Sequence, residues 1–280
     1  NETLALVGES GCGKSTLGKC AIGLISPNSG ESIFLNENIY EKKGEELKQI
    51  KKNLQIIFQD PYASLNPRMT VGEIIAEPII THNKGMRKED IKLKVLDLME
   101  DVGIRKEYYN RYPHQFSGGQ RQRIGIARAI ALNPKLIVCD EPVSALDVSI
   151  QSQVLNLLKD LQEKRKASYL FISHDLSVVN FIADRVCVMF LGKICEIGNT
   201  DDIFENPLHP YTKLLLDAIP SIENAGRQKE MLKGEIPSPI DVPSGCRFHT
   251  RCPYCMEVCR TDEPVLSEKN GRSVACHRVK

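Results

Sequence analysis

The stretch Thr3-Leu-Ala-Leu-Val-Gly-Glu-Ser-Gly-Cys-Gly-Lys-Ser15 decides the fold of this chain of 280 residues. It begins as a short apolar run, Thr3–Val7, which is typical of a buried parallel strand. The run leads directly into Gly8–Ser15, which fits the pattern G-x-x-x-x-G-K-[S/T]. Glycines let such a loop curl until successive N–H groups point at phosphate oxygens, with a helix dipole behind them. The sequence therefore predicts a loop that binds the phosphates of a nucleotide.

Two side chains of this loop are expected to carry its chemistry. Lys14 reaches the β- and γ-phosphates, and the hydroxyl of Ser15 ligates Mg²⁺. The alternative is a chance glycine-rich turn, which the preceding strand and the following helical pattern disfavour. That helical pattern places Leu17, Ala21 and Leu24 on one face. The expected phosphate contacts come from Gly8, Glu9, Ser10, Gly11, Cys12, Gly13, Lys14, Ser15 and Thr16.

The composition is that of an ordinary globular protein. Hydrophobic residues make up 41% of the chain, and 37 Lys and Arg against 36 Asp and Glu leave a net charge of +1. Such a balance argues against a protein that works by coating nucleic acid. No stretch approaches the roughly 18 uncharged apolar residues that a membrane span requires.

Strands alternate with helices along the first two hundred residues, which predicts an α/β fold with a parallel sheet covered on both sides. Pro and Gly become more frequent after Asn199, so we expect a main domain over 1–204 and an accessory extension over 205–280. Strands are predicted within Ser32–Tyr40 and at Asn53–Phe58, Lys135–Cys139 and Ser168–Ile172. Helices are predicted at Asp90–Val102 with Leu93, Leu96 and Met99 on one face, and at Gln120–Leu132, Val148–Lys164 and Tyr211–Ile219.

Two carboxylates follow the apolar run Lys135-Leu-Ile-Val-Cys-Asp-Glu141. A buried strand would deliver Asp140 beside the phosphate loop, where it can hold Mg²⁺ through water. Glu141 comes one residue later and is placed to polarise an attacking water. A strand that merely ends in two solvated acids is the alternative, and the presence of Gly8–Ser15 disfavours it.

Phe116-Ser-Gly-Gly-Gln120 indicates a second anion-binding helix start, with Ser117 as the N-cap. In the helix that follows, Ile124, Ala127 and Ile130 are expected to face inward, whereas Arg121, Arg123 and Arg128 lie elsewhere. A nucleotide needs only one phosphate-binding loop from the chain that binds it. The second anion-binding helix start is therefore expected to contact a nucleotide that is bound by a partner chain.

Together these motifs resemble the ATPase subunits of ABC transporters, in the order typical of that family, over residues 2 to about 200. Phe116 stands where the commonest signature motif has Leu, an apolar change of little expected effect. The six motifs are Gly8–Ser15 (Walker A), Gln59 (Q-loop), Ser117–Gln120 (signature), Lys135–Glu141 (Walker B), Ser144–Asp147 (D-loop) and His174 (switch histidine).

The resemblance implies a P-loop NTPase fold with an ABC-type helical subdomain over residues 62–132. It also implies two ATPase chains that close head-to-tail around two ATP molecules. In this family an aromatic residue upstream of Walker A stacks on adenine, so that residue is expected to precede Asn1. By resemblance, the catalytic residues are Glu141, His174 and Lys14. Nucleotide contacts are added by Gln59, Ser117, Gly118, Gly119, Gln120 and Asp147, and Mg²⁺ is held by Ser15, Gln59 and Asp140.

Three longer segments narrow the resemblance to the oligopeptide/dipeptide importer ATPases, of the second ATPase subunit type. They are Gln59–Thr70, Asp140–Ser149 and Asn206–Thr212. The implied partners are a sister ATPase, two membrane permeases and an extracytoplasmic solute-binding protein, with the chain peripheral on the cytoplasmic face of the membrane. Alternatives are an importer of nickel, glutathione or another solute, and a non-transport ABC ATPase. Direct contact with nucleic acid is not expected.

The ten cysteines fall into two groups. Cys12, Cys20, Cys139, Cys187 and Cys195 sit in apolar or Gly-rich settings typical of reduced thiols. The remaining five lie within Cys246–Cys276, a Pro-rich segment that needs a cross-link to order it. Zinc and an iron–sulfur cluster both accept such thiolates, whereas a disulfide is disfavoured in a reducing cytosol.

The family resemblance bears on this choice. It implies a [4Fe–4S] cluster, with Zn²⁺ as the alternative, on Cys246, Cys252, Cys259 and Cys276. Cys255 has no counterpart in that pattern and is expected to be a bystander or a spare ligand. The glutaredoxin-like Cys252-Pro-Tyr-Cys255 lacks the βαβ context of a redox protein.

Overall fold

The computed structural model describes residues 1–218, 237–238, 240–269 and 271–279. By internal contacts the chain divides into two compact units. The first contains Asn1 and Thr16–Leu170, and the second contains Glu2–Ser15 and Phe171–Lys280. Strand β6 (Ser168–Ser173) runs from the first unit into the second.

The first unit contributes one end of an eight-stranded sheet. Strands β4 (Leu54–Ile57) and β5 (Leu136–Asp140) pair in parallel, and the strand order is β4-β5-β6. The predicted strands at these three places are therefore confirmed. Helix α1 (Lys14–Ala21) begins in the second unit and continues into the first, where β2 (Ile33–Phe34) and β3 (Glu37–Asn38) form a hairpin. The longer helices that follow are α2 (Gly44–Asn53), α3 (Val71–His82), α4 (Lys88–Asp101), α5 (Gly118–Ile130) and α6 (Val148–Arg165). Short 3-10 helices lie at Lys106–Tyr108 and Pro113–Gln115.

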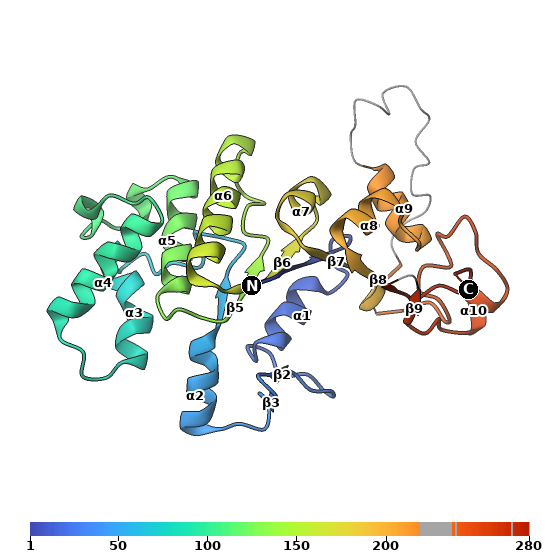
Figure 1. The fold of residues 1–280 in the computed structure, drawn as a ribbon, viewed down its shortest axis with the longest axis horizontal. Coiled ribbons are helices and arrows are strands. Elements are labelled where there is room, and N and C mark those ends of the chain that lie inside the picture. Colours follow the sequence, from blue (N-terminus) through green and yellow to red (C-terminus); the bar gives the residue numbers. More distant parts are fainter. Residues whose placement is uncertain (219–236, 239, 270, 280) are drawn as a thin grey trace. The chain divides into compact units, whose positions relative to one another are not determined.

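Helices α3, α4 and α5 pack on one another and form the helical part of this unit (Figure 1, blue-green to green). The start of α3 is fixed by a capping box, in which Thr70 and Glu73 satisfy each other's backbone N–H groups. Helix α4 buries Val95, Leu98 and Met99, whereas Leu93 is 61% exposed.

The predicted face of α4 is therefore only partly correct. Val95 is followed by Leu98, Met99 and Val102, which gives apolar residues at i, i+3, i+4 and i+7. The competing face through Leu93 reaches Glu100 at i+7 and cannot be buried as fully. Similarly, Leu17 and Leu24 are 40% and 51% exposed, so the apolar face predicted after the phosphate loop is not a core face.

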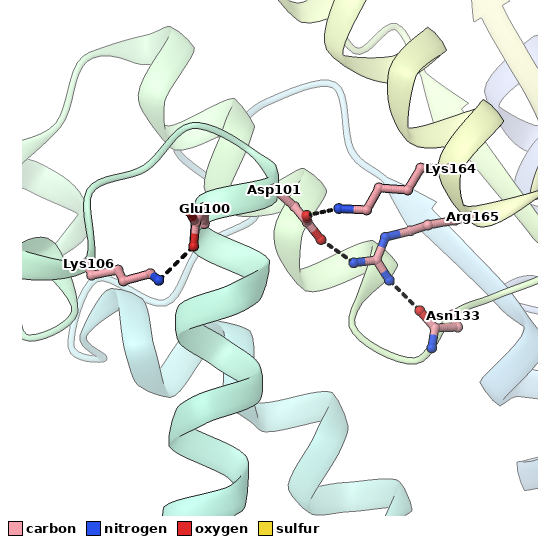
Figure 2. Close-up of polar contacts among 6 residues, drawn as sticks. All are labelled: Glu100, Asp101, Lys106, Asn133, Lys164 and Arg165. Atoms are coloured by element: carbon pink, nitrogen blue, oxygen red, sulfur yellow. Dashed lines mark hydrogen bonds and ion pairs between the residues drawn. The ribbon is translucent and has the colours of Figure 1, made fainter.

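An ionic cluster ties α4 to the end of α6 (Figure 2). The carboxylate of Asp101 accepts hydrogen bonds from Lys164 and Arg165, and Arg165 also donates to Asn133. The Asp101 side chain is only 14% exposed. Burial acts to raise the pKa of Asp101, but the two cationic donors outweigh burial and hold it below its ordinary value. This cluster differs from the neighbouring pair of Lys106 and Glu100, which is 2.6 Å long but lies in solvent.

The second unit holds a mixed sheet in the order β6-β1-β7-β8-β10-β9. Strand β1 (Thr3–Val7) pairs in parallel with β7 (Arg185–Phe190), and Val7 lies opposite Val188. Strand β8 (Lys193–Asn199) then returns antiparallel to β7. The outer strands are β10 (Arg272–Val274) and β9 (Ser267–Lys269), both antiparallel to their neighbours.

The expectation of a wholly parallel sheet is wrong in this unit because of one tight turn. Leu191 and Gly192 join β7 to β8 with φ angles of +42° and +79°. Two consecutive residues with positive φ are the signature of a two-residue hairpin, which reverses the strand without a crossover helix.

The described residues of the second unit also form the helices α7 (Leu176–Ile182), α8 (Thr200–Glu205), α9 (Pro210–Asp217) and α10 (Val258–Thr261). Helix α9 confirms the helix predicted from Tyr211, although Ile219, where that prediction ends, lies outside the described residues. The core of the unit gathers Val7, Val188, Phe190, Tyr211 and Phe248, the last two from the extension. None of the helices in the described ranges combines the length and the apolarity that a membrane crossing requires.

We expect the substitution Asp101→Ala to lower the free energy of unfolding by about 1–3 kcal/mol, because two charged donors lose their shielded acceptor. Urea denaturation would measure the loss. The matched control is Glu100→Ala, which removes a solvent-exposed pair and should leave the urea midpoint unchanged.

The same cluster predicts a pH dependence. Because the pKa of Asp101 is lower in the folded chain, its stabilisation is present above the ordinary value of 3.8 and is lost as the pH falls through the lowered value. The stability difference between the wild type and Asp101→Asn should therefore shrink in that acid range. A difference that stayed constant down to the lowest pH would contradict the ionic origin.

Candidate nucleotide-binding site

The phosphate loop follows β1 and depends on glycine at three positions. Gly8, Gly11 and Gly13 have φ angles of +154°, +80° and +103°, which side chains rarely allow. Gly8 carries a second constraint, because a Cβ atom there would lie 2.1 Å from the carbonyl oxygen of Met189 at the end of β7. The loop is therefore pressed against the sheet at the point where its curl begins.

Lys14 is held at this loop by the backbone of the loop itself. Its side chain is buried, and Nζ donates to the carbonyl oxygens of Gly8 at 2.8 Å and Glu9 at 3.1 Å. Sγ of Cys12 lies 3.9 Å from the same ammonium. Burial raises the pKa of the Cys12 thiol despite the nearby Lys14, so the thiol stays protonated at neutral pH. The structure therefore places Lys14 within the predicted loop, and its contact with phosphate stays a prediction.

The two residues that contact Glu9 from the extension were not predicted. The guanidinium of Arg251 binds its carboxylate, and the hydroxyl of Tyr211 accepts its backbone N–H at 2.9 Å. They lie 242 and 202 residues away from Glu9 in the chain, and no local pattern links such distant positions.

In the first unit the structure brings together the two acids and the glutamine that were predicted from sequence. Asp140 ends β5 and is 3% exposed, with Nζ of Lys19 at 3.7 Å. Glu141 follows with φ at +46°, and its carboxylate Oε2 accepts a hydrogen bond of 2.9 Å from Nε2 of Gln59. The hydroxyl of Ser144 donates to the Glu141 carbonyl at 3.0 Å. A glutamate with a positive φ angle has a strained backbone, and such strain is concentrated at functional sites in proteins.

The signature segment forms the capped helix start that the sequence predicts. Ser117 is the N-cap of α5, its hydroxyl accepts the N–H of Gln120 at 3.3 Å, and the Gln120 side chain accepts the N–H of Ser117 at 3.1 Å. The helix begins at Gly118, two residues before the predicted start. A Cβ atom on Gly119 would lie 2.4 Å from the Ile150 side chain, so glycine lets α6 approach this helix end closely.

The position of Arg121 differs from the prediction. It was placed away from the buried face of the helix, but it is 4% exposed. Its guanidinium lies 3.4 Å from the ring centroid of Tyr62, and Nε donates to the carbonyl of Pro113 at 2.7 Å. A planar cation can be buried between an aromatic ring and a carbonyl in this way, which an apolar periodicity does not reveal. Ile124, Ala127 and Ile130 are buried as predicted.

Asp147 and His174 lie at the starts of helices or next to them. Asp147 is the N-cap of α6, where Oδ1 accepts the N–H of Ile150 at 3.0 Å. His174 is exposed and follows β6, and the next residue, Asp175, caps α7. Gly8–Ser15 and His174 belong to the second unit, while Gln59, Asp140, Glu141, Ser117–Gln120 and Asp147 belong to the first. Their roles toward a nucleotide stay predictions.

The four cysteines expected to bind metal line one small cavity in the second unit, together with His209, His249 and His277. All ten cysteines are free. Burial raises the pKa of Cys246 to about 11 and also raises that of Cys252, so both are thiols at neutral pH. Among the described residues, no three His, Cys, Asp or Glu side chains form a group that could hold a metal ion. The structure therefore gathers the predicted cysteines without forming a metal centre. They are Cys246, Cys252, Cys259 and Cys276.

Comparison with known proteins places this geometry in a family. Residues 1–144 match the family described as ABC transporter, and residues 195–259 match the oligopeptide/dipeptide transporter, C-terminal region. The chain is 51% identical to the oligopeptide transport ATP-binding protein OppF of Salmonella typhimurium, over 99% of this chain and 84% of that protein. It is 53% identical to AppF of Bacillus subtilis, which has the same description, over 99% of this chain and 85% of that protein.

A solved structure agrees with these matches. The ATP-binding cassette MJ0796, a dimer in a post-hydrolysis state with ADP and Pi, superposes with a TM-score of 0.64 at 30% identity. The superposition covers 71% of this chain and 85% of that one. The chain is therefore an ATPase that belongs to the ABC transporter family, and within it to the branch with the oligopeptide/dipeptide transporter C-terminal region.

Proposed function

We propose that this protein is the ATP-hydrolysing subunit of an ABC importer that powers the uptake of oligopeptides or dipeptides. The observation that carries the proposal is the identity of 51% and 53% with two oligopeptide transport ATP-binding proteins over 99% of this chain. The phosphate loop, the paired Gln59 and Glu141, and the capped start of α5 support it.

The proposal includes the assembly in which such a chain works. A sister ATPase would pair with it head-to-tail, two membrane permeases would carry the solute, and an extracytoplasmic solute-binding protein would deliver it. The chain would sit at the cytoplasmic face of the membrane, with an ATPase domain over 1–204, a helical subdomain over 62–132 that docks on a permease, and an extension over 205–280. The solute would touch the partners and not this chain, so nickel, glutathione or another solute remains the alternative cargo.

The phosphates of ATP would bind the N–H groups of Gly8–Ser15 and the ammonium of Lys14. Mg²⁺ would be held by oxygen atoms of Ser15, Gln59 and Asp140, the donor type that this ion prefers, and would neutralise phosphate charge. The carboxylate of Asp140 is buried with Nζ of Lys19 at 3.7 Å, and a buried carboxylate of this kind favours a cation beside it, as Mg²⁺ would be.

Glu141 would accept the proton of the attacking water. Its hydrogen bond from Gln59 holds one carboxylate oxygen in place, so the carboxylate is oriented before ATP arrives. Gln59 would couple nucleotide binding to the permease, because the residue that orients Glu141 would also help to hold Mg²⁺. His174 would contact the γ-phosphate. Ser117 and the following N–H groups would face the nucleotide of the sister chain, as the anion-binding start of α5 favours.

We expect Glu141→Gln to keep ATP binding and to reduce ATP turnover by about a hundredfold or more, because general-base catalysis contributes about 10²–10⁴-fold. Lys14→Ala should instead weaken binding itself, since it removes a charge paired with phosphate. ATP binding and phosphate release by the protein assembled with its partners would measure the two effects.

The matched control is Glu163→Gln, the same change at an exposed position on α6, which should leave turnover unaltered. Normal turnover in Glu141→Gln would rule out its role as the base. Normal ATP binding in Lys14→Ala would rule out the phosphate loop as the binding element.

A second part of the proposal concerns the cysteines of the extension. We propose that Cys246, Cys252, Cys259 and Cys276 hold a [4Fe–4S] cluster, with Zn²⁺ as the alternative, that orders the extension. Four sulfur donors around one cavity are the chemistry that either group requires. The placement in the structure forms no such centre, and the raised pKa of Cys246 means that a proton must leave when a metal binds.

Protein purified without oxygen should be brown, with iron and acid-labile sulfide in equal amounts, and Cys252→Ser should abolish the colour. Cys255→Ser is the matched control, because Cys255 lies three residues away and is proposed as a bystander or a spare ligand. The colour of this variant should persist. Colourless protein with one equivalent of zinc would exclude the cluster. Colourless protein without metal would exclude both groups.

A further inference from the structure

Glu9 is the acidic residue of a loop that is expected to bind anions, Gly8–Ser15. An unpaired carboxylate there would repel the phosphates that the loop binds, and at close range this repulsion is weakly screened by salt. The structure shows how the charge is balanced. Every polar group of Glu9 has a partner in the second unit, two of them from the extension.

The first partner is Arg251. Its Nη1 lies 2.7 Å from Oε2 of Glu9, and Nη2 lies 3.2 Å from Oε1, so the pair is bidentate. The Arg251 side chain is 4% exposed and that of Glu9 is 18% exposed. A fork-shaped contact that is shielded from water fixes the carboxylate plane as well as its charge.

The second partner is Tyr211, the second residue of α9. Its hydroxyl accepts the backbone N–H of Glu9 at 2.9 Å. The tyrosine is fully buried, and its ring centroid lies 4.8 Å from that of Phe190 and 5.2 Å from that of Phe248. The hydroxyl is therefore held by packing, and it fixes the backbone at the start of the loop.

The same ring cluster positions Arg251. Its backbone N–H donates to the carbonyl of Phe248 at 3.0 Å, which closes a turn, and its guanidinium lies 5.9 Å from the Phe190 ring. Phe248 packs on Phe190 with ring centroids 5.3 Å apart. The end of β7, the start of α9 and the turn at Phe248–Arg251 therefore pack together next to Glu9.

The third group of Glu9 connects these contacts to the phosphate lysine. Its carbonyl oxygen accepts a hydrogen bond from Nζ of Lys14 at 3.1 Å. The residue that Arg251 and Tyr211 hold is therefore the one against which Lys14 rests. A shift of Glu9 would move the ammonium that binds phosphate.

We propose that Arg251 and Tyr211 are positioning residues for ATP, which hold and neutralise Glu9 so that the loop accepts phosphate. The inference rests on the proposed binding of ATP at Gly8–Ser15 and adds the extension to the nucleotide site. Neither side chain needs to touch ATP. Arg251 cancels a negative charge in the loop, and Tyr211 fixes the peptide that carries it.

The test is ATP affinity and the split between KM and kcat in the full chain assembled with its partners. Arg251→Ala should raise the Kd and KM for ATP about tenfold, the effect of losing one charge-assisted contact, while kcat changes less. Adding Glu9→Gln to Arg251→Ala removes the unbalanced charge and should restore most of the affinity. Arg251→Lys keeps the positive charge but loses the bidentate contact, so its Kd for ATP should lie between those of the wild type and Arg251→Ala.

Tyr211→Phe keeps the buried ring and removes only the hydroxyl, so it should raise the Kd by a smaller factor than Arg251→Ala. The matched control is Arg260→Ala, in the same segment, where the arginine is 61% exposed and pairs only loosely with Glu257. It should bind ATP like the wild type.

The outcomes separate the two proposals. Wild-type affinity in Arg251→Ala would overturn the inference and leave the proposed function intact. Weak binding that Glu9→Gln does not rescue would also overturn it, because an extension that merely unfolds is not repaired by neutralising Glu9. Failure of the wild type itself to bind ATP would overturn the proposed function and the inference together.

Discussion

The second unit depends on the close approach of the loop backbone at Gly8 to the carbonyl of Met189, where no side chain fits. This approach is possible because β1 and β7 pair in parallel with Val7 opposite Val188, which brings the start of the loop over the end of β7. The turn after β7 then returns the contact, since the N–H of Gly192 donates to the carbonyl of Cys12 at 2.9 Å. Two contacts with the end of β7 and the turn after it, at Met189 and at Gly192, therefore fix the loop conformation that presents N–H groups to phosphate.

Features that are encoded within a few residues could be predicted from the sequence. The glycines of the loop, the Ser117 cap and the carboxylates after β5 each follow from a local pattern with one physical explanation. Gln59 and Glu141 were each predicted as site residues, but their contact was not, because 82 residues separate them. Resemblance identified the two residues, and the structure adds the hydrogen bond between them.

Features that arise from tertiary packing could not be predicted. The apolar pattern of α4 offered two faces, and contacts with α3 and α5 selected the one through Val95. The apolar periodicity of α5 predicts Arg121 away from the inward face, whereas the exposed ring of Tyr62 covers its guanidinium and the Pro113 carbonyl accepts its Nε–H. Strands β9 and β10 are three residues each, too short for a pattern. Their order comes from pairing, because β10 pairs with β8 and β9 pairs with β10.

The pairing of β10 with β8 also explains how the extension is fixed next to the phosphate loop. Glu196 of β8 is fully buried, accepts the N–H groups of Leu208 and His209 at 2.9 Å each, and lies 3.7 Å from Arg272 of β10. Burial lowers the pKa of His209 to about 4, so its neutral Nδ1 accepts the N–H of Tyr211 at 3.0 Å. The start of α9 is therefore fixed by the sheet that also carries the loop. Tyr211 is fixed at the start of α9 and belongs to the same core as Val7, the residue before the loop. Its hydroxyl accepts the N–H of Glu9, so the packing of the extension determines the position of Glu9.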